Sequence, residues 1–334
     1  ADDLIPEIAV GRFSVVSLAE ADVVVVEVIQ YETDPPRVLP GGTFYGKAAI
    51  ASYFLPGEGG NPPNVENYRR VFGAAEDIRG RLQSNGFAVQ RIYTAKHPLT
   101  NETRPRYYMD GVTPLPAPLR PEDEYPWDGD TQQIVDAFNQ GKALFFHVDH
   151  GGSSGWGHPH FTTSHLPQLV NGELLPLVLS DNCSSGAFDY WSPGFAESIL
   201  RVPGGGAIGV IAFTRNSNNG VGKQFLVGVV DALWPSAYPN FSDDQERHRL
   251  GDMLNHARAV MTVKYTDADP TSDAYKGALC YARMLTLFGD PTLKVWLENP
   301  FEIPDFGDEW VDGPKPEFGY PMRGVTITVF EERR

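Results

Sequence analysis

The stretch FFHVDHGGSSGWG, residues 145–157, is an apolar run that ends in two histidines, an aspartate and a group of glycines and serines. A strand buried in a parallel sheet has this form, because its body is continuously apolar and polar residues begin where it ends. Three interpretations fit the polar end. The strand could deliver metal ligands, it could deliver a catalytic base, or its histidines could merely cap a core strand.

Apolar segments with strand and helix periodicity alternate around this stretch. Such strands and helices of about ten residues indicate β-α units and an α/β sandwich. The segment 19–31 is β-branched but carries spaced acids and no turn signal, and we expect a helix there. The other expected strands are 47–54, 87–94, 143–149, 175–180 and 207–213, and the other expected helices are 64–85, 131–139, 163–170, 195–201, 223–234 and 248–265.

The composition of the chain changes after residue 298. Residues 299–320 are rich in proline, and the following GVTITVFEE alternates like a strand. We therefore expect one main domain over residues 1–298, followed by a linker and the start of a β-rich extension over residues 299–334.

The overall composition is that of a globular protein, with 41 % apolar and 21 % charged residues. A net charge of −16 without a basic stripe argues against a nucleic-acid partner. No stretch approaches the roughly 18 apolar residues of a membrane span. The first residues, Ala1-Asp2-Asp3, lack the basic start and apolar core of a signal peptide, so we expect a mature or processed chain.

Two consecutive strands end in reactive side chains, His150 in HVDHGG and Cys183 in LSDNCSSG. A right-handed β-α-β crossover places such strand ends side by side, where open α/β sheets bind ligands. An imidazole beside a thiol can take its proton, and the thiolate then attacks a carbonyl. Cys183 and Cys280 are the only two cysteines of the chain. The spacing alone is therefore also compatible with Cys183 as a small buried side chain or in a disulfide bridge with Cys280.

Around these strand ends the sequence resembles the gingipain-like cysteine peptidases. The resemblance implies a caspase-like three-layer α/β/α sandwich with a mostly parallel sheet, and a secreted or cell-surface bacterial cysteine endopeptidase that acts on proteins or peptides. The matching stretches are IAVGRFS (8–14), EGG (58–60), DHGGSSGWGHPHFTTSHLPQL (149–169), DNCSSGAFDY (181–190), PGFAESILRV (193–202) and LFGDPTL (287–293).

By this resemblance His150 is the general base, Cys183 the nucleophile and Glu58 the acid that orients the histidine. The backbone N–H groups of Gly151 and Cys183 would bind the oxyanion. Asp149 or a backbone carbonyl is the alternative orienting group. The first part of the family's catalytic region has no counterpart here, and we expect a separate N-terminal segment or pro-region to complete the fold.

The substrate preference rests on a second similarity. DNCSSG is similar to the Asp-x-Cys-x-Ser-Gly pattern of metacaspases, whose aspartate lies in the pocket for the substrate residue before the cleaved bond, P1. Asp181 would then meet an arginine or lysine, although the acid and tryptophan that known gingipains use are missing from 67–72 and 214–222. The other expected substrate-binding residues are Trp156, which would wall the site, and Thr214, Asn216 and Asn219, beside which the peptide would lie.

Two other function classes stay open. HVDHGG is also similar to the His-x-His-x-Asp-His motif of zinc-dependent metallo-β-lactamases, but Phe145 stands where that motif needs a histidine. A non-catalytic binding or processing module is the third interpretation. The peptidase chemistry needs no metal cofactor, although loop carboxylates could hold a structural calcium ion.

Two further residues have expected structural roles. Cys280 lies at helical spacing in GALCYARMLTLF and is expected in the core. His147 lies three residues before His150, so on a strand it faces the opposite way and should pack or form a hydrogen bond.

Overall fold

The computed structural model describes residues 6–36, 44–54, 65–95, 114–120, 125–190, 192–217, 219–235, 245–263 and 271–298. Six strands form one sheet in the order β2-β1-β3-β7-β8-β9, and only the β8–β9 pair is antiparallel. The predicted mostly parallel sheet is therefore confirmed. The strands are β1 (Lys47–Tyr53), β2 (Ala88–Thr94), β3 (Leu144–Val148), β7 (Leu177–Asp181), β8 (Gly209–Phe213) and β9 (Leu285–Phe288).

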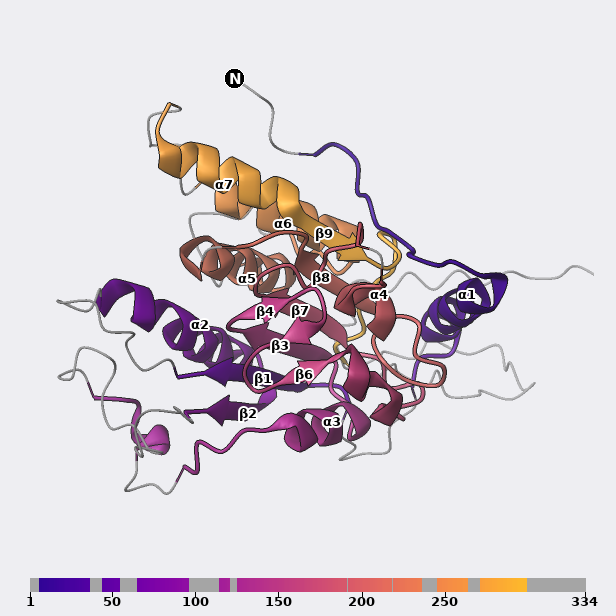
Figure 1. Ribbon diagram of the computed structural model, residues 1–334, viewed down its shortest axis with the longest axis horizontal. Helices are drawn as coiled ribbons and strands as arrows, with labels where there is room; N and C mark the ends of the chain where they lie inside the picture. The colour runs from indigo at the N-terminus through magenta and orange to yellow at the C-terminus, as the bar shows by residue number, and fades with distance from the viewer. Residues whose placement is uncertain are drawn as a thin grey trace, which may run out of the picture. The chain divides into compact units, whose positions relative to one another are not determined.

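Helices cover both faces of this sheet (Figure 1). Alternate strand residues point to opposite faces, so Phe146 and Leu179 lie in one hydrophobic core and Phe145 and Val178 in the other. The first core includes α2 (Val65–Ser84), α5 (Asn219–Leu233) and α6 (Leu250–Val263), and the second includes α3 (Thr131–Asn139) and α4 (Phe195–Ile199). This is the expected three-layer α/β/α arrangement.

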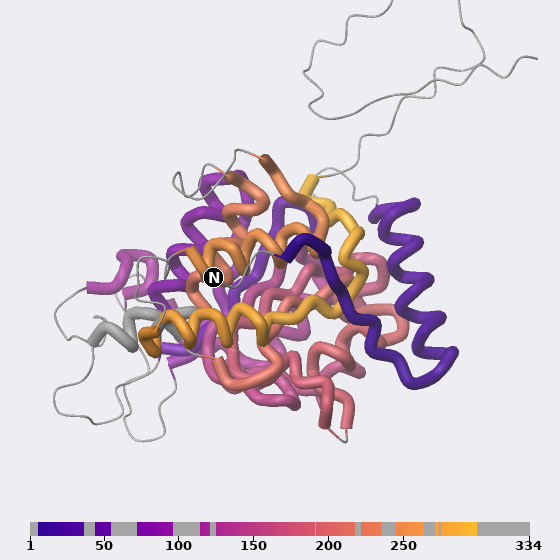
Figure 2. Tube along the Cα trace, turned by 90° about the horizontal axis from the view of Figure 1, so that it is seen from above, coloured from indigo at the N-terminus to yellow at the C-terminus, as the bar shows by residue number. Residues whose placement is uncertain are grey.

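The N-terminal segment runs beside β9 before it enters α1 (Leu18–Thr33) (Figure 2). Arg12 donates its N–H to the carbonyl of Leu287 at 2.9 Å, and Gly289 donates to the carbonyl of Arg12 at 3.0 Å. The hydroxyl of Ser17 caps α1, because it accepts a hydrogen bond from the N–H of Glu20 at 3.2 Å. The helix expected over 19–31 is confirmed.

The helix expected over 163–170 is a 3₁₀-helix, η3 (Thr163–Gln168). Pro167 lies inside it and has no N–H to give to an α-helical hydrogen bond, which favours short, tight turns. The ring nitrogen Nδ1 of His165 accepts the N–H of Thr162 at 3.0 Å and so caps its start. The expected α-helix is thus wrong in type, although the turn occupies the expected place.

The prediction that Cys280 lies in the core is wrong. It lies on α7 (Asp273–Met284), which buries Ala278 and Ala282 against the domain and leaves the thiol of Cys280 exposed. The helix also ends before the stretch GALCYARMLTLF does, because the chain passes directly from Met284 into β9. Together with the partly buried Tyr281 and Met284, these two alanines pack α7 against the domain, so the opposite side of the helix faces solvent.

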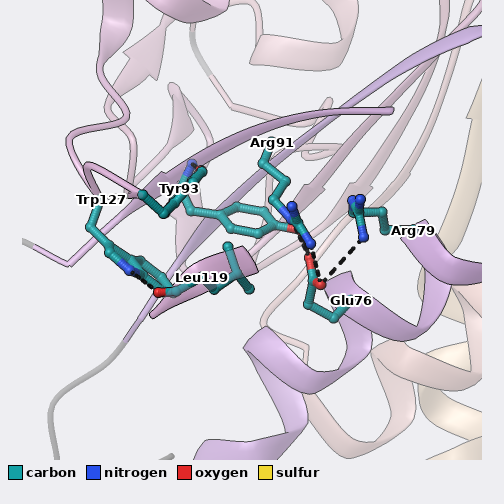
Figure 3. Close-up of polar contacts among 7 residues, drawn as sticks. Glu76, Arg79, Arg91, Tyr93, Leu119 and Trp127 are labelled. Atoms are coloured by element: carbon teal, nitrogen blue, oxygen red, sulfur yellow. Dashed lines mark hydrogen bonds and ion pairs between the residues drawn. The ribbon is translucent and has the colours of Figure 1, made fainter. Parts of the chain in front are cut away.

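An ion cluster joins α2 to the edge strand β2 (Figure 3). The guanidinium of Arg91 donates to both carboxylate oxygens of Glu76, each at 2.9 Å, and the Tyr93 hydroxyl donates to Glu76 at 2.8 Å. Nearby, the indole N–H of Trp127 donates to the carbonyl of Leu119, in η1 (Ala117–Leu119), at 2.9 Å. These contacts hold the sheet edge that lies farthest from β9.

The predicted extension, residues 299–334, lies outside the described residues, as does Glu58. Among the described residues, no helix combines the length and the apolar character that crossing a membrane requires.

Candidate active site

The ends of β3 and β7 lie side by side and in register. Val148 pairs with Asp181, and the N–H of Asp149 donates to the carbonyl of Asp181 at 3.3 Å. His150 and Cys183 each follow this pair by two residues. A Cβ atom on Gly151 would lie 2.5 Å from Oδ1 of Asn182, so the chain after His150 passes directly against the residue before Cys183. The predicted neighbourhood of the two strand ends is confirmed.

Both reactive side chains are accessible. His150 is exposed and Cys183 is half-buried, with its Sγ 3.7 Å from the carbonyl oxygen of Ser217. Ser184 has a φ of 58°. This left-handed backbone conformation is uncommon for residues other than glycine and is typical of a tight turn. This turn is fixed because the N–H of Ser184 donates to the carbonyl of Arg215 at 3.1 Å. The turn therefore holds the thiol next to the segment 214–217.

A small antiparallel sheet that the sequence did not predict follows β3. It consists of β4 (Gly151–Gly152), β5 (Gly155–Trp156) and β6 (Phe161–Thr162). It turns the chain back so that Gly157 donates its N–H to the carbonyl of His150 at 2.8 Å. Both ends of the sharp bend around His150 are therefore attached to neighbouring backbone.

A buried hydrogen-bond network lies behind His150 and Cys183. Nε2 of His147 lies 3.2 Å from the carbonyl of His158, which can only accept, so Nε2 carries the proton. Nδ1 of His147 then accepts from the amide of Asn182 at 2.7 Å. Burial lowers the pKa of His147 to about 3, in agreement with a neutral ring. As expected, His147 is packed and hydrogen-bonded, and it is fully buried.

Ser180 is the centre of the same network. Its hydroxyl accepts from the amide of Asn182 at 2.7 Å and from the indole N–H of Trp156 at 2.9 Å, which leaves its own proton for the hydroxyl of Ser185 at 2.9 Å. The Oδ1 atom of Asn182 is the exception, since it has no partner among the described residues and lies against Gly151. The network thus ties Asn182 in place immediately before Cys183.

Trp156 does not wall the site. It is only 1 % exposed, and its ring stacks on His147 with centroids 4.6 Å apart and planes 2° apart. A substrate could touch this ring only if the second core opened. We therefore correct its expected role from substrate contact to support of the buried network.

Asp149 is bound to a different histidine from the one it precedes. Its buried carboxylate lies 3.1 Å from Nδ1 of His158, whose ring stacks on Tyr53 with centroids 4.3 Å apart. Burial raises the pKa of Asp149, and the hydrogen bond with His158 opposes this. Because its carboxylate contacts His158, Asp149 is a poor candidate for the group that orients the His150 ring.

Asp181 lies on the other face of β7, against the first turn of α5. It is 4 % exposed, and its carboxylate occupies the space that a Cβ on Gly222 would need. Burial raises the pKa of Asp181 to about 8, and no described residue donates a hydrogen bond or supplies a cation to it. A carboxylate in this state gains strongly from a positive group that reaches it.

The family comparison agrees with this geometry. The model of peptidase family C25 matches residues 1–296. The chain belongs to peptidase family C25. Gingipain R2 of Porphyromonas gingivalis is 28 % identical over 176 residues, which is 52 % of this chain and 22 % of that relative. The C25 chain described here thus spans less than a quarter of this curated relative's length.

Solved structures show the same fold at lower identity. The crystal structure of the Arg-specific cysteine proteinase gingipain R (RgpB) matches with a TM-score of 0.66 at 21 % identity, covering 90 % of this chain and 58 % of that one. The complex of the Porphyromonas gingivalis RgpB pro- and mature domains matches with a TM-score of 0.65 at 21 % identity, covering 90 % and 60 %. The caspase-like α/β fold expected for this C25 chain is therefore confirmed.

The remaining predicted residues of the C25 site have different placements. Thr214 donates its N–H to the carbonyl of Met284 at 3.0 Å, and Oδ1 of Asn216 accepts from the Ser184 hydroxyl at 3.1 Å. Asn219 begins α5, and its side chain lies outside the described set, as does Glu58. Asn216 is thus beside the turn at Cys183–Ser184, whereas the N–H of Thr214 holds the adjoining backbone.

The zinc interpretation lacks a ligand set in the described part of this C25 chain. His147 faces the second core and has both ring nitrogens occupied, while His150 lies beyond the strand end. The described residues contain no group of three or more His, Cys, Asp or Glu side chains placed to hold a metal ion. The motif similarity therefore does not extend to three dimensions within these residues.

Proposed function

We propose that this chain is the catalytic part of a cysteine endopeptidase that cleaves after arginine or lysine. The observation that carries the proposal is the pairing of Val148 with Asp181, which brings His150 and Cys183 to adjacent strand ends. Family membership and the two accessible side chains support the same chemistry.

The reaction begins when His150 takes the proton of the Cys183 thiol. The thiolate attacks the scissile carbonyl, and the backbone N–H groups of Gly151 and Cys183 donate to the oxygen that becomes negative. His150 then gives its proton to the leaving amine, which leaves an acyl-enzyme, and water hydrolyses this thioester. We propose Glu58 as the group that orients His150, in keeping with the family resemblance.

The preference for a basic residue at P1 rests on Asp181. Its carboxylate is buried two residues before Cys183 and lacks a cation among the described residues. A substrate guanidinium or ammonium group would supply that cation, and the solved relative described as Arg-specific is consistent with this. The peptide lies extended beside residues 214–219, where Asn216 is next to the turn that carries Cys183.

We further propose that the chemistry needs no metal, that a pro-region partners the chain, and that the protein is a bacterial enzyme that acts in the secreted or cell-surface space. The solved complex of RgpB pro- and mature domains supports the proposal of a pro-region. The acidic composition fits an extracellular protein, and loop carboxylates could bind a structural calcium ion.

The test is turnover of a fluorogenic peptide library varied at P1, with dithiothreitol and with or without a chelator. Wild type should cleave after Arg and Lys and keep its activity in chelator. Cys183→Ala and His150→Ala should each lose at least about 1,000-fold in kcat/KM while circular dichroism shows an unchanged fold. Activity that survives in Cys183→Ala and disappears with chelator would revive the zinc hydrolase.

A further inference from the structure

A cavity adjoins the turn at Cys183–Ser184. It has a volume of about 540 Å³, and its walls come from two parts of the chain that are distant in sequence. Ser184, Arg215 and Asn216 form the wall next to Cys183, and α7 forms the opposite wall. Neither the proposed proton transfers nor the P1 contact with Asp181 uses this cavity.

The cavity is continuous with the proposed path of the peptide. Cys183 contacts the carbonyl of Ser217, and Ser184 is hydrogen-bonded to Arg215 and Asn216. A peptide that lies along 214–217 must therefore pass the mouth of the cavity just before its scissile bond reaches Cys183. At about 3.3 Å per extended residue, the cavity is within reach of the side chains that precede P1.

The wall chemistry selects one kind of side chain. Tyr281 and Met284 of α7 and Tyr190 of the facing loop supply aromatic and thioether surface. Such surfaces bind aromatic rings through edge or stacked contacts and through sulfur–aromatic contacts. Among the described residues that line the cavity there is no acidic side chain to pair with a second basic side chain.

Arg215 adds a flat, fixed surface to the same wall. Its Nη1 and Nη2 donate to the two carboxylate oxygens of Asp189 at 3.1 and 2.6 Å. This fork compensates the charge and holds the guanidinium plane, on which an aromatic ring can stack.

We propose that this cavity is a substrate subsite that binds an aromatic side chain at P2 or P3. The proposal rests on the proposed peptidase function, since it takes the peptide path from that mechanism. The enzyme would then select sequences in which a basic residue lies at P1 and an aromatic residue lies one or two positions before it.

Cys280 provides a reporter that does not depend on turnover. Its thiol is exposed and lies on the cavity wall, and the chain has only two cysteines. In Cys183→Ala, Cys280 is thus the single thiol, and its alkylation by iodoacetamide can be followed by intact-mass spectrometry. Peptides with Arg at P1 and Phe at P2 or P3 should slow alkylation at least fivefold, whereas the matched Gly peptides should change it less than twofold. Equal protection by Phe and Gly peptides would overturn the subsite.

A filled cavity gives the second test. Cys280→Phe should lower the ratio of kcat/KM for Phe against Gly peptides about tenfold, through KM. Lys276→Phe, an exposed residue of the same helix outside the cavity wall, should leave that ratio unchanged. An unchanged ratio in Cys280→Phe would refute the subsite. If wild type shows no turnover at all, the peptidase proposal fails, and the alkylation experiment still decides whether the cavity binds aromatic peptides.

Discussion

Two carboxylates, that of the partly buried Glu76 on α2 and that of the buried Asp181 at the end of β7, differ in what surrounds them. Glu76 receives two hydrogen bonds from Arg91 and one from Tyr93, and Arg79 lies 3.6 Å away (Figure 3). Asp181 is 4 % exposed and has no described donor or cation beside it. A buried acid surrounded by donors is a structural element, whereas a buried acid without them is stable only when it is neutral or when a ligand supplies the charge.

The neighbours of Asp181 on β7 sharpen this contrast. Ser180 and Asn182 point to the opposite face, where they are linked to His147 and Trp156 by hydrogen bonds. Within three consecutive residues, the strand thus carries a nearly complete polar network on one face and, on the other, a carboxylate that no described residue compensates. Since the same strand builds both faces, the contrast between them arises on the α5 side, where Asp181 lies against Gly222.

The largest effect is expected when the structural acid is removed. Glu76→Ala leaves Arg91 and the Tyr93 hydroxyl without their acceptor in a site where both side chains of the ion pair are about one-tenth exposed. Breaking such a pair should cost about 3 kcal/mol in the free energy of unfolding, measured by urea denaturation.

Asp77 is the matched control on the same helix. Its ion pairs with Arg81 at 3.6 Å and Lys223 at 3.2 Å involve side chains that are about one-third exposed. Asp77→Ala should therefore cost no more than about 1 kcal/mol. Equal losses in the two variants would show that the Glu76 cluster is not a structural centre.

A smaller effect, on specificity and not on stability, is expected at the other acid. Asp181→Asn keeps the size of the side chain but removes the charge that a basic P1 residue would meet. A charge-assisted hydrogen bond contributes about 1.5–3 kcal/mol, so kcat/KM for Arg peptides should fall about 10- to 100-fold relative to Leu peptides. The measurement is the Arg-to-Leu ratio in wild type and variant.

Asp149→Asn serves as the control for this experiment, because Asp149 is also a buried acid near His150 but contacts His158. Its replacement should leave the Arg-to-Leu ratio unchanged, whatever it does to the absolute rate. Loss of selectivity in both variants would mean that Asp181 acts through the general field of the site, and not as the P1 partner.

The sequence alone predicts the sheet and the juxtaposition of His150 and Cys183, because both follow from local patterns. Apolar runs mark the parallel strands, and consecutive strands joined by a crossover must end at the same sheet edge. The family resemblance supplies the roles that the pattern cannot assign.

The features that sequence patterns did not predict depend on contacts between residues that are distant in the chain. His147, Ser180 and Asn182 form a network across two strands and a loop, and only the fold reveals which polar groups satisfy each other. Trp156 follows a glycine-rich loop, as site residues often do, yet it packs in the second core. The exposure of Cys280 depends on how narrow a stripe α7 buries, which its apolar residues do not show.

The smallest predicted effect is a pH dependence of peptide binding, measured on the inactive Cys183→Ala variant. The pKa of Asp181 is raised to about 8 by burial, so at pH 7 about one molecule in ten carries the charged carboxylate, and at pH 9 about nine in ten do. A P1 arginine binds the charged form and releases a proton when it binds the neutral one. The affinity for an Arg peptide, relative to a Leu peptide, should therefore rise about tenfold from pH 7 to pH 9 and then level.

The Arg-to-Leu comparison at each pH removes every pH-dependent contribution that is common to both peptides. In Cys183→Ala/Asp181→Asn the ratio of the two affinities should be flat over the same range, because the amide does not titrate. A ratio that stays constant with pH while Asp181 is present would mean that the carboxylate is already ionised at pH 7. Some cation would then compensate it before substrate arrives, and the distinction between Asp181 and Glu76 would be lost.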